Sequence, residues 1–319
     1  MNPPTGHNPL DSIGSLERRR ADRVSSQRRE LGAPGFDPER YERLLAAADR
    51  IARDLRATGI DPDDAGPVVE ARDAIRRAID ASARAGGIDQ HELGEIRDRA
   101  ERSVLDLTEL SWIVYELVVP NSPWHDALLA TLGAARPEPV GWFGLYVAAM
   151  CRHAGYRVRP TPDSADALFL SHGRWEVGIG LGAVREDSPP GDGIAPAAEA
   201  AARALARTRR AGLIAIDLGD LSRRHLRVVN DAVGIGEMAR TIDQVIRDGL
   251  ATVRERIDPE ITSGLLASAR CCLENVPAST TTMNRIIRVV PLCHRDDPRR
   301  AGIERLARPF GGLGDPTED

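Results

Sequence analysis

The chain has 319 residues and a formal net charge of −5, and all 43 of its basic residues are arginine because the sequence contains no lysine. This length is enough for about two domains with sizeable cores. The net charge argues against a surface that binds nucleic acid over its whole extent but is compatible with a local basic patch. The lack of lysine excludes mechanisms in which this chain supplies a lysine as Schiff-base amine or general base, because arginine stays protonated.

Location and redox state are constrained by the same composition. No stretch approaches the roughly 18 apolar residues of a membrane span. The first residues also lack the basic-then-apolar order of a signal peptide, so we expect a cytoplasmic protein without a membrane partner. The four cysteines form no C-x-x-C pattern, which predicts buried thiols rather than a zinc site or a disulfide framework.

The first part of the chain predicts an arm and a helical domain. Residues 1–35 combine Pro, Gly and Ser with clustered arginines and predict a disordered Arg-rich arm, in which the arginines are either solvated or in contact with phosphate. Residues 36–120 predict a helical domain with helices over 38–59, 68–84 and 89–119, because apolar residues recur there at helical spacing between Gly and Pro turns. Such a domain favours packing against a protein partner or a second copy.

Residues 121–310 predict an α/β domain with a C-terminal extension, followed by a flexible tail over 311–319. The expected elements are helices at 124–132 and 140–153, a strand at 155–158, a hairpin at 166–182, a loop at 185–193, a helix at 195–210 and a strand at 213–218. This αβββαβ order implies a mixed sheet with helices on its faces. Beyond it we expect a helix at 235–256, extended segments at 263–273 and 286–293, and a short helix at 303–307.

The hairpin is the stretch with the most unusual pattern. In its second strand, apolar residues alternate with one glutamate and three glycines: Trp175, Val177, Ile179 and Leu181 point one way, and Glu176, Gly178, Gly180 and Gly182 the other. This predicts one packed face and one face nearly bare of side chains. A two-residue turn at His172-Gly173 would pair Asp166 with Ile179 on the packed face. A three-residue turn or a bulge would instead bring Asp166 to the Glu176 face, and the sequence leaves both open.

In order and hydrophobic pattern, residues 140–220 resemble the restriction-endonuclease-like superfamily, the PD-(D/E)XK nucleases. The resemblance is carried by Phe143-Gly144-Leu145, Gly155-Tyr156-Arg157-Val158, Asp166, Ile179-Gly180-Leu181-Gly182, and Gly212 to Leu218. It implies a restriction-endonuclease-like αβββαβ mixed-sheet core that follows the N-terminal helical unit.

The resemblance also implies where catalytic groups would stand. In that family an Asp and a Glu hold Mg²⁺, and a Lys beside them helps to activate the attacking water. Asp166 matches the first acid, whereas the second acid falls on Gly180, the Lys on Gly182 and the acid of the opening helix on Gly144. Glu176 shares the face of Gly180 but precedes it by four residues, about 13 Å along a strand. Asp166 and Glu176 are therefore candidate catalytic remnants, and Asp166 is the candidate metal ligand.

Three interpretations follow for function. The favoured one is a nuclease-derived, catalytically inactive binding or scaffold protein without a cofactor, whose partner is nucleic acid, another protein or a second copy. The alternative is a Mg²⁺-dependent nuclease with a rearranged site of Asp166 and Glu176, supported by Arg185 or Asp217. The third is an unrelated α/β protein. A dinucleotide site at residues 178–182 is disfavoured, because the expected loop at 185–193 offers no helix N-terminus to hold phosphates.

Overall fold

The structure is a computed structural model that describes residues 38–57, 59–61, 66–83, 90–117, 123–132, 139–161, 164–184, 190–220, 227–229, 232–275 and 280–308. The chain divides into two compact units between Gly155 and Tyr156. This division lies further along the chain than the expected boundary at residue 120, and it places the helix that ends at His153 with the N-terminal helices. The predicted arm at 1–35 and tail at 311–319 lie outside the described residues.

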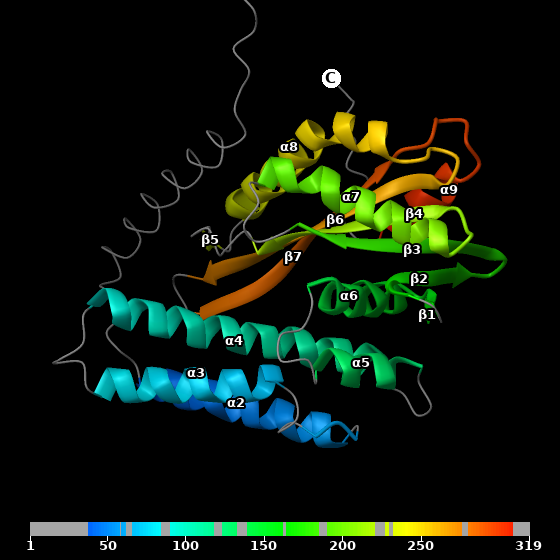
Figure 1. Ribbon diagram of the computed structural model, residues 1–319. Helices are drawn as coiled ribbons and strands as arrows, with labels where there is room; N and C mark the ends of the chain where they lie inside the picture. The colour runs from blue at the N-terminus through cyan, green and yellow to red at the C-terminus, as the bar shows by residue number, and fades with distance from the viewer. Residues whose placement is uncertain are drawn as a thin grey trace, which may run out of the picture. The chain divides into compact units, whose positions relative to one another are not determined.

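The first unit is helical. Its described helices are α2 (Pro38–Ala57), α3 (Gly66–Ala83), α4 (Gln90–Leu117), α5 (Trp124–Leu132) and α6 (Pro139–His153), as Figure 1 shows. These agree with the predicted helices to within a few residues. Gly59 ends α2 as predicted, because it has a φ of +85°, a left-handed conformation that glycine adopts more easily than other residues. The amides of Gly59 and Ile60 donate to the carbonyls of Arg56 and Leu55, which satisfies the last turn of the helix.

The second unit is a mixed α/β structure built on one sheet. Its strands are β1 (Arg157–Thr161), β2 (Ser164–His172), β3 (Trp175–Ala183), β4 (Gly212–Asp220), β5 (Arg227–Val229), β6 (Thr262–Asn275) and β7 (Thr280–Pro291). Its described helices are α7 (Pro190–Arg207), α8 (Ala232–Arg256) and α9 (Arg300–Ala307). A mixed α/β fold was predicted and is confirmed.

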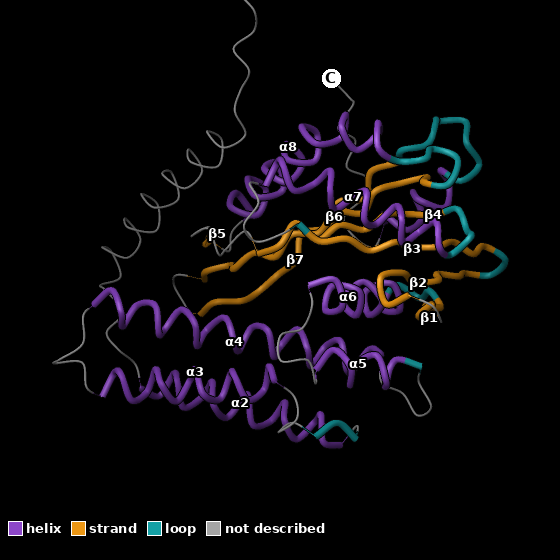
Figure 2. Tube along the Cα trace, viewed as in Figure 1, coloured by secondary structure: helices purple, strands orange, loops and turns teal. Residues whose placement is uncertain are grey.

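The sheet runs in the order β1-β2-β3-β4-β6, with β7 on the far edge of β6 (Figure 2). Strands β1, β2 and β3 form an antiparallel meander, β3, β4 and β6 are parallel, and β7 returns antiparallel to β6. The short strand β5, which was not predicted, pairs with β6 beyond the part that β4 occupies. Strand β4 is buried along its apolar run, as is usual for a central parallel strand.

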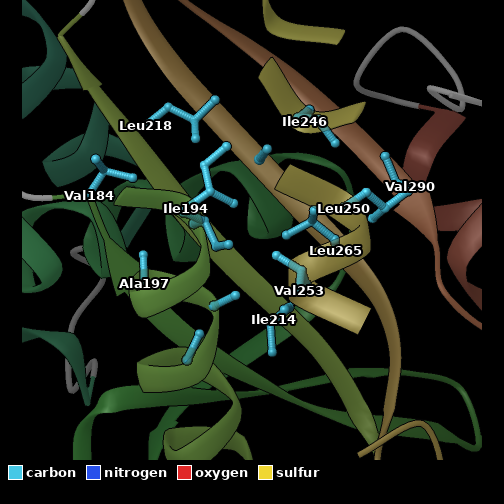
Figure 3. Packing of buried hydrophobic residues seen from close by; sticks show 14 of the residues in the cluster. Val184, Ile194, Ala197, Ile214, Leu218, Ile246, Leu250, Val253, Leu265 and Val290 are labelled. Atoms are coloured by element: carbon cyan, nitrogen blue, oxygen red, sulfur yellow. The ribbon is translucent and has the colours of Figure 1, made fainter. Parts of the chain in front are cut away.

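Helices α7 and α8 cover one face of this sheet. Their apolar residues form a single core with alternate residues of β4 and β6, as Figure 3 shows for Ile194, Ile214, Val253 and Leu265. Helix α9 lies on the opposite face, where Gly302 contacts the indole of Trp175. Among the described helices, none has both the length and the hydropathy needed to cross a bilayer.

One predicted loop is corrected by the structure. Residues 190–193 were expected to belong to a Pro/Gly loop, but α7 already begins at Pro190. Proline is tolerated in the first turn because the amide that it lacks would have no partner there. A helix therefore does follow β3 after a short connection. A dinucleotide site was disfavoured because no helix N-terminus was expected there, and that expectation is wrong.

The segment before α9 is held by an arginine and predicts a pH effect. Arg299 donates to the Asp297 carboxylate, with Nη2 to Oδ2 at 2.6 Å, and to the carbonyls of Pro259 and Glu260. The hydrogen bonds from the Arg299 side chain and amide lower the pKa of Asp297. A carboxyl group whose pKa is lower in the folded state stabilises the fold at any pH above its unfolded-state pKa, about 3.9. This contribution is lost as the pH falls through the lower pKa of the folded state.

We therefore expect Asp297→Asn to lower the urea midpoint at neutral pH, and the difference from the wild type to shrink as the pH falls below about 4. Asp296→Asn is the control, because this carboxylate is 93% accessible and its contact with His294 Nδ1, at 3.3 Å, is exposed and so should change the midpoint little. A gap between wild type and Asp297→Asn that stays constant with pH would contradict the role of this carboxylate.

Candidate functional site

The glycine face of β3 packs closely against the backbone of α7. A Cβ atom on Gly180 would lie 1.9 Å from the carbonyl oxygen of Ala201, and one on Gly182 would lie 2.2 Å from that of Ala197. Both oxygens belong to the backbone of α7. The face that was expected to be nearly bare is therefore covered by a helix, and its glycines are the residues that let the two backbones approach.

The spacing of small residues in α7 explains this contact. Ala197, Ala201 and Leu205 recur every four residues and so lie along one side of the helix, about 6 Å apart. The glycines recur every second residue along β3, about 6.6 Å apart. Because these two repeats nearly match, each glycine faces one turn of α7, with Gly178 next to Leu205 and Thr208.

This packing bears on the positions to which the resemblance would assign catalytic groups. It would place the second acid and the lysine at Gly180 and Gly182, where even a methyl group meets backbone atoms of α7. No side chain fits at either position in this arrangement. The third family position, Gly144, is buried in α6 and belongs to the other unit.

The hairpin register decides where Asp166 lies. The turn is formed by Gly173 and Arg174, since His172 pairs with Trp175, and Leu168 rather than Asp166 pairs with Ile179. The register between β1 and β2 shifts between Pro160 and Thr161, next to Asp166. At this irregularity Asp166 Oδ2 lies 3.9 Å from Nη2 of Arg207 on α7. Asp166 therefore faces the helix that covers the Glu176 face, through a bulge rather than a three-residue turn.

Glu176 is held by two arginines that come from different parts of the chain. Its Oε1 accepts a hydrogen bond from Arg159 Nη2 on β1 at 2.6 Å, and its Oε2 lies 3.4 Å from Arg210 Nη2, just after α7. Arg159 also lies over the ring of Phe169, 5.4 Å from its centroid. Glu176 thus joins β1, β3 and the turn before β4.

These contacts define an arginine patch, by which we mean Arg157, Arg159, Arg207 and Arg210. Strand pairing places Arg157 opposite Ser171, which pairs in turn with Glu176, so Arg157 projects from the same face. All four arginines are exposed. The described carboxylates among them are Asp166 and Glu176, so the patch carries more positive than negative charge. This patch could not be predicted from the sequence, because its members are separated by up to 53 residues and are brought together by the strand register and by the position of α7.

The two candidate acids do not form a site for a single magnesium ion. Ala167, next to Asp166, pairs with Gly180, and Gly180 lies four residues from Glu176 along β3, which is about 13 Å. Two oxygens bound to one Mg²⁺ lie within about 4 Å of each other. Within the described residues, no group of three or more His, Cys, Asp and Glu side chains is arranged to hold a metal ion. The arrangement therefore does not fit the ion that the resemblance implies.

The third acid considered in the sequence, Asp217, lies elsewhere. Its Oδ1 accepts hydrogen bonds from Arg285 Nη1 on β7 at 3.2 Å and from the amide of Gly219 at 3.1 Å. Arg285 Nη1 also lies 3.4 Å from Ser268 Oγ on β6. The side chains of Asp217 and Arg285 are 10% and 2% exposed, so this is a buried ion pair on the face opposite α7. Arg185 lies outside the described residues.

The thiols that the structure describes offer no nucleophile at this site. Cys151 is buried in α6, and burial raises the pKa of its thiol to about 12. Cys293 is partly exposed, and its pKa is raised by burial and by the nearby Asp297 carboxylate. Thiols with raised pKa values are poorly ionised at neutral pH and react slowly. The prediction of buried thiols holds for Cys151 but is wrong for Cys293.

Comparison of the chain with family models, with curated proteins and with solved structures finds no match.

Proposed function

We propose that the α/β unit is a binding module without nuclease activity, derived from a restriction-endonuclease-like ancestor, and that it contacts nucleic acid through the arginine patch. The observation that carries this proposal is the packing of α7 on β3. Gly180 and Gly182, the positions of the ancestral acid and lysine, lie against the carbonyl oxygens of Ala201 and Ala197. A catalytic side chain at either position would require α7 to move.

The charges around the remaining acids support the same proposal. Asp166 and Glu176 lie within ion-pairing distance of arginines rather than beside each other. A carboxylate beside a guanidinium is a weaker ligand for a divalent cation, because the two cations repel each other. An exposed group of arginines instead favours contact with phosphate, to which guanidinium groups donate in a planar, paired geometry.

A divalent-metal nuclease with a rearranged site is the competing proposal. It would need Asp166 and Glu176 to leave their arginines and to approach each other across about 13 Å of strand. No described contact favours that movement.

Incubation with single- and double-stranded DNA and RNA tests the choice between these proposals. We expect no cleavage with either Mg²⁺ or Mn²⁺, and binding that weakens steeply with salt, by a slope of about −0.9 in log K against log salt for each duplex phosphate contacted. Engagement of all four arginines would give a slope of about −3.6. Metal-dependent cleavage that disappears in Asp166→Ala or Glu176→Ala would reject the non-catalytic proposal.

A further inference from the structure

The strongest unexplained feature of the arginine patch is the position of Glu176 between two guanidinium groups. Each carboxylate oxygen is approached by one arginine, at 2.6 Å from Arg159 and 3.4 Å from Arg210. An anion with two oxygens shared by two arginines is also the geometry in which a phosphate group is bound. A phosphate held between the same two guanidinium groups would therefore displace the Glu176 carboxylate.

The exposure of the three side chains agrees with such a site. Arg159 and Arg210 are 64% and 56% exposed, whereas Glu176 is 27% exposed. The carboxylate thus lies deeper than the arginines, and each guanidinium has five N–H donors, more than its contact with Glu176 uses. The contact with Phe169 limits the freedom of the Arg159 guanidinium, so less entropy is lost when a ligand binds.

The neighbouring arginine indicates a polymer rather than a single small anion. Arg157 lies two residues before Arg159 on the same face of β1, about 7 Å along the strand, and is exposed. Arginines repeated along one strand face complement a chain with regularly spaced phosphates.

We propose that Arg159 and Arg210 form a phosphate-binding pair for a nucleic-acid backbone, and that Glu176 occupies this pair in the unliganded protein and so weakens binding. This inference rests on the proposed binding function. In the bound state a backbone phosphate takes the place of the Glu176 carboxylate between the two guanidinium groups. Binding then costs the energy of two exposed ion pairs, which makes Glu176 a built-in restraint on affinity.

The chain provides a matched control for Glu176. Glu199 on α7 also lies between two arginines, at 2.8 Å from Arg203 and 3.4 Å from Arg256 on α8. It is 42% exposed, so it is at least as accessible to solvent as Glu176. In the part of the chain that the structure describes, neither Arg203 nor Arg256 lies over an aromatic ring, and both belong to helices rather than to a strand, so we assign no phosphate site to this second pair.

The test measures binding of the full-length protein to a fluorescein-labelled single strand and to its duplex by anisotropy, over a range of salt. We expect Glu176→Gln to tighten binding about fivefold, the effect of removing a competing ion-pair energy of about 1 kcal/mol. Arg159→Gln and Arg210→Gln should each weaken binding and make the salt slope shallower by about 0.7 to 0.9. Glu199→Gln, Arg203→Gln and Arg256→Gln should leave both quantities unchanged, with thermal unfolding confirming that every variant is folded.

The outcomes separate this inference from the proposed function. If the wild type binds and Arg159→Gln and Arg210→Gln weaken binding while Glu176→Gln behaves like Glu199→Gln, the restraint is wrong and contact through the arginine patch stands. If Arg159→Gln and Arg210→Gln also behave like the control variants, the assignment of binding to the arginine patch fails as well. If neither the wild type nor Glu176→Gln binds, both fail, whereas binding by Glu176→Gln alone supports the restraint. Unlabelled oligonucleotide, inorganic phosphate and polyglutamate are then compared as competitors at the same concentration of anionic groups. If phosphate or polyglutamate displaces the labelled strand as well as the oligonucleotide does, the assignment to a nucleic-acid backbone is wrong.

Discussion

Gly180→Ala is expected to lower the free energy of unfolding by about 3 kcal/mol, at the upper end of the cost of an extra methyl group in a packed core. The added Cβ would lie 1.9 Å from the Ala201 carbonyl oxygen, whereas ordinary contacts begin near 3.4 Å. Helix α7 would thus have to move by about 1.5 Å. The sign of the change in the free energy of unfolding distinguishes a packed site from an open one. In an unobstructed strand, alanine is more stable than glycine by roughly 0.5 to 1 kcal/mol. Urea unfolding followed by far-UV circular dichroism measures the change.

The other glycines of β3 should give a graded series. A Cβ on Gly182 would also meet a backbone oxygen, at 2.2 Å, so its cost should be close to that of Gly180→Ala. A Cβ on Gly178 would meet the side chains of Thr208 and Leu205, which have more freedom to rotate than a helix backbone has to shift. We therefore expect Gly178→Ala to be the least destabilising of the three.

Gly236→Ala in α8 is the control for these substitutions. Apart from its chain neighbours and the backbone of α8, no atom of the described residues lies within 4 Å of the Cβ that it would add, so alanine should raise the free energy of unfolding by roughly 0.5 to 1 kcal/mol through its helix propensity. If Gly180→Ala behaves like Gly236→Ala, then α7 does not pack against β3 as described, and the central argument against a catalytic site there is lost.

Periodicity explains why most elements could be predicted from the sequence. The apolar run of β4 and the alternation in β3 specify strands, and the stripe of α2 specifies a helix up to Gly59. The start of α7 could not be found in this way, since Pro190 follows another Pro and precedes Gly, which is also the signature of a loop. Likewise, element order could not assign α6 to a unit, because that depends on which helices it contacts.

The site was harder to predict than the fold, for two physical reasons. The alternation along a strand shows on which side a glycine lies, but because glycine has no side chain it does not show what covers that side. Here the four-residue repeat of Ala197 and Ala201 indicates a helix that can pack closely against the glycines. The contacts of Glu176 depend on the turn at Gly173 and on where α7 ends. A change of one residue in that turn would place Glu176 on the opposite face from Arg159.

Arg285→Met is expected to lower the free energy of unfolding by about 3 to 5 kcal/mol, because it removes one partner of a buried ion pair and leaves the Asp217 carboxylate without the guanidinium that compensates its charge. The side chains of Asp217 and Arg285 are 10% and 2% exposed, and Arg285 also contacts Ser268. The measurement is again urea unfolding. The slope of the free energy of unfolding against urea concentration should be the same in the variant and in the wild type if both unfold in two states.

A second arginine of β7, in a less buried ion pair, shows whether the expected loss of stability depends on burial. Arg288 Nε lies 2.6 Å from Asp243 on α8, but these side chains are 19% and 31% exposed, so Arg288→Met should cost about 1 kcal/mol or less. The double variant Asp217→Leu/Arg285→Met should recover most of the stability lost in Arg285→Met, because apolar groups of similar volume can replace a buried pair at little cost. Equal losses for Arg285→Met and Arg288→Met would mean that the Asp217 pair is hydrated. A double variant less stable than Arg285→Met would mean that Asp217 stabilises the end of β4 mainly through the Gly219 amide.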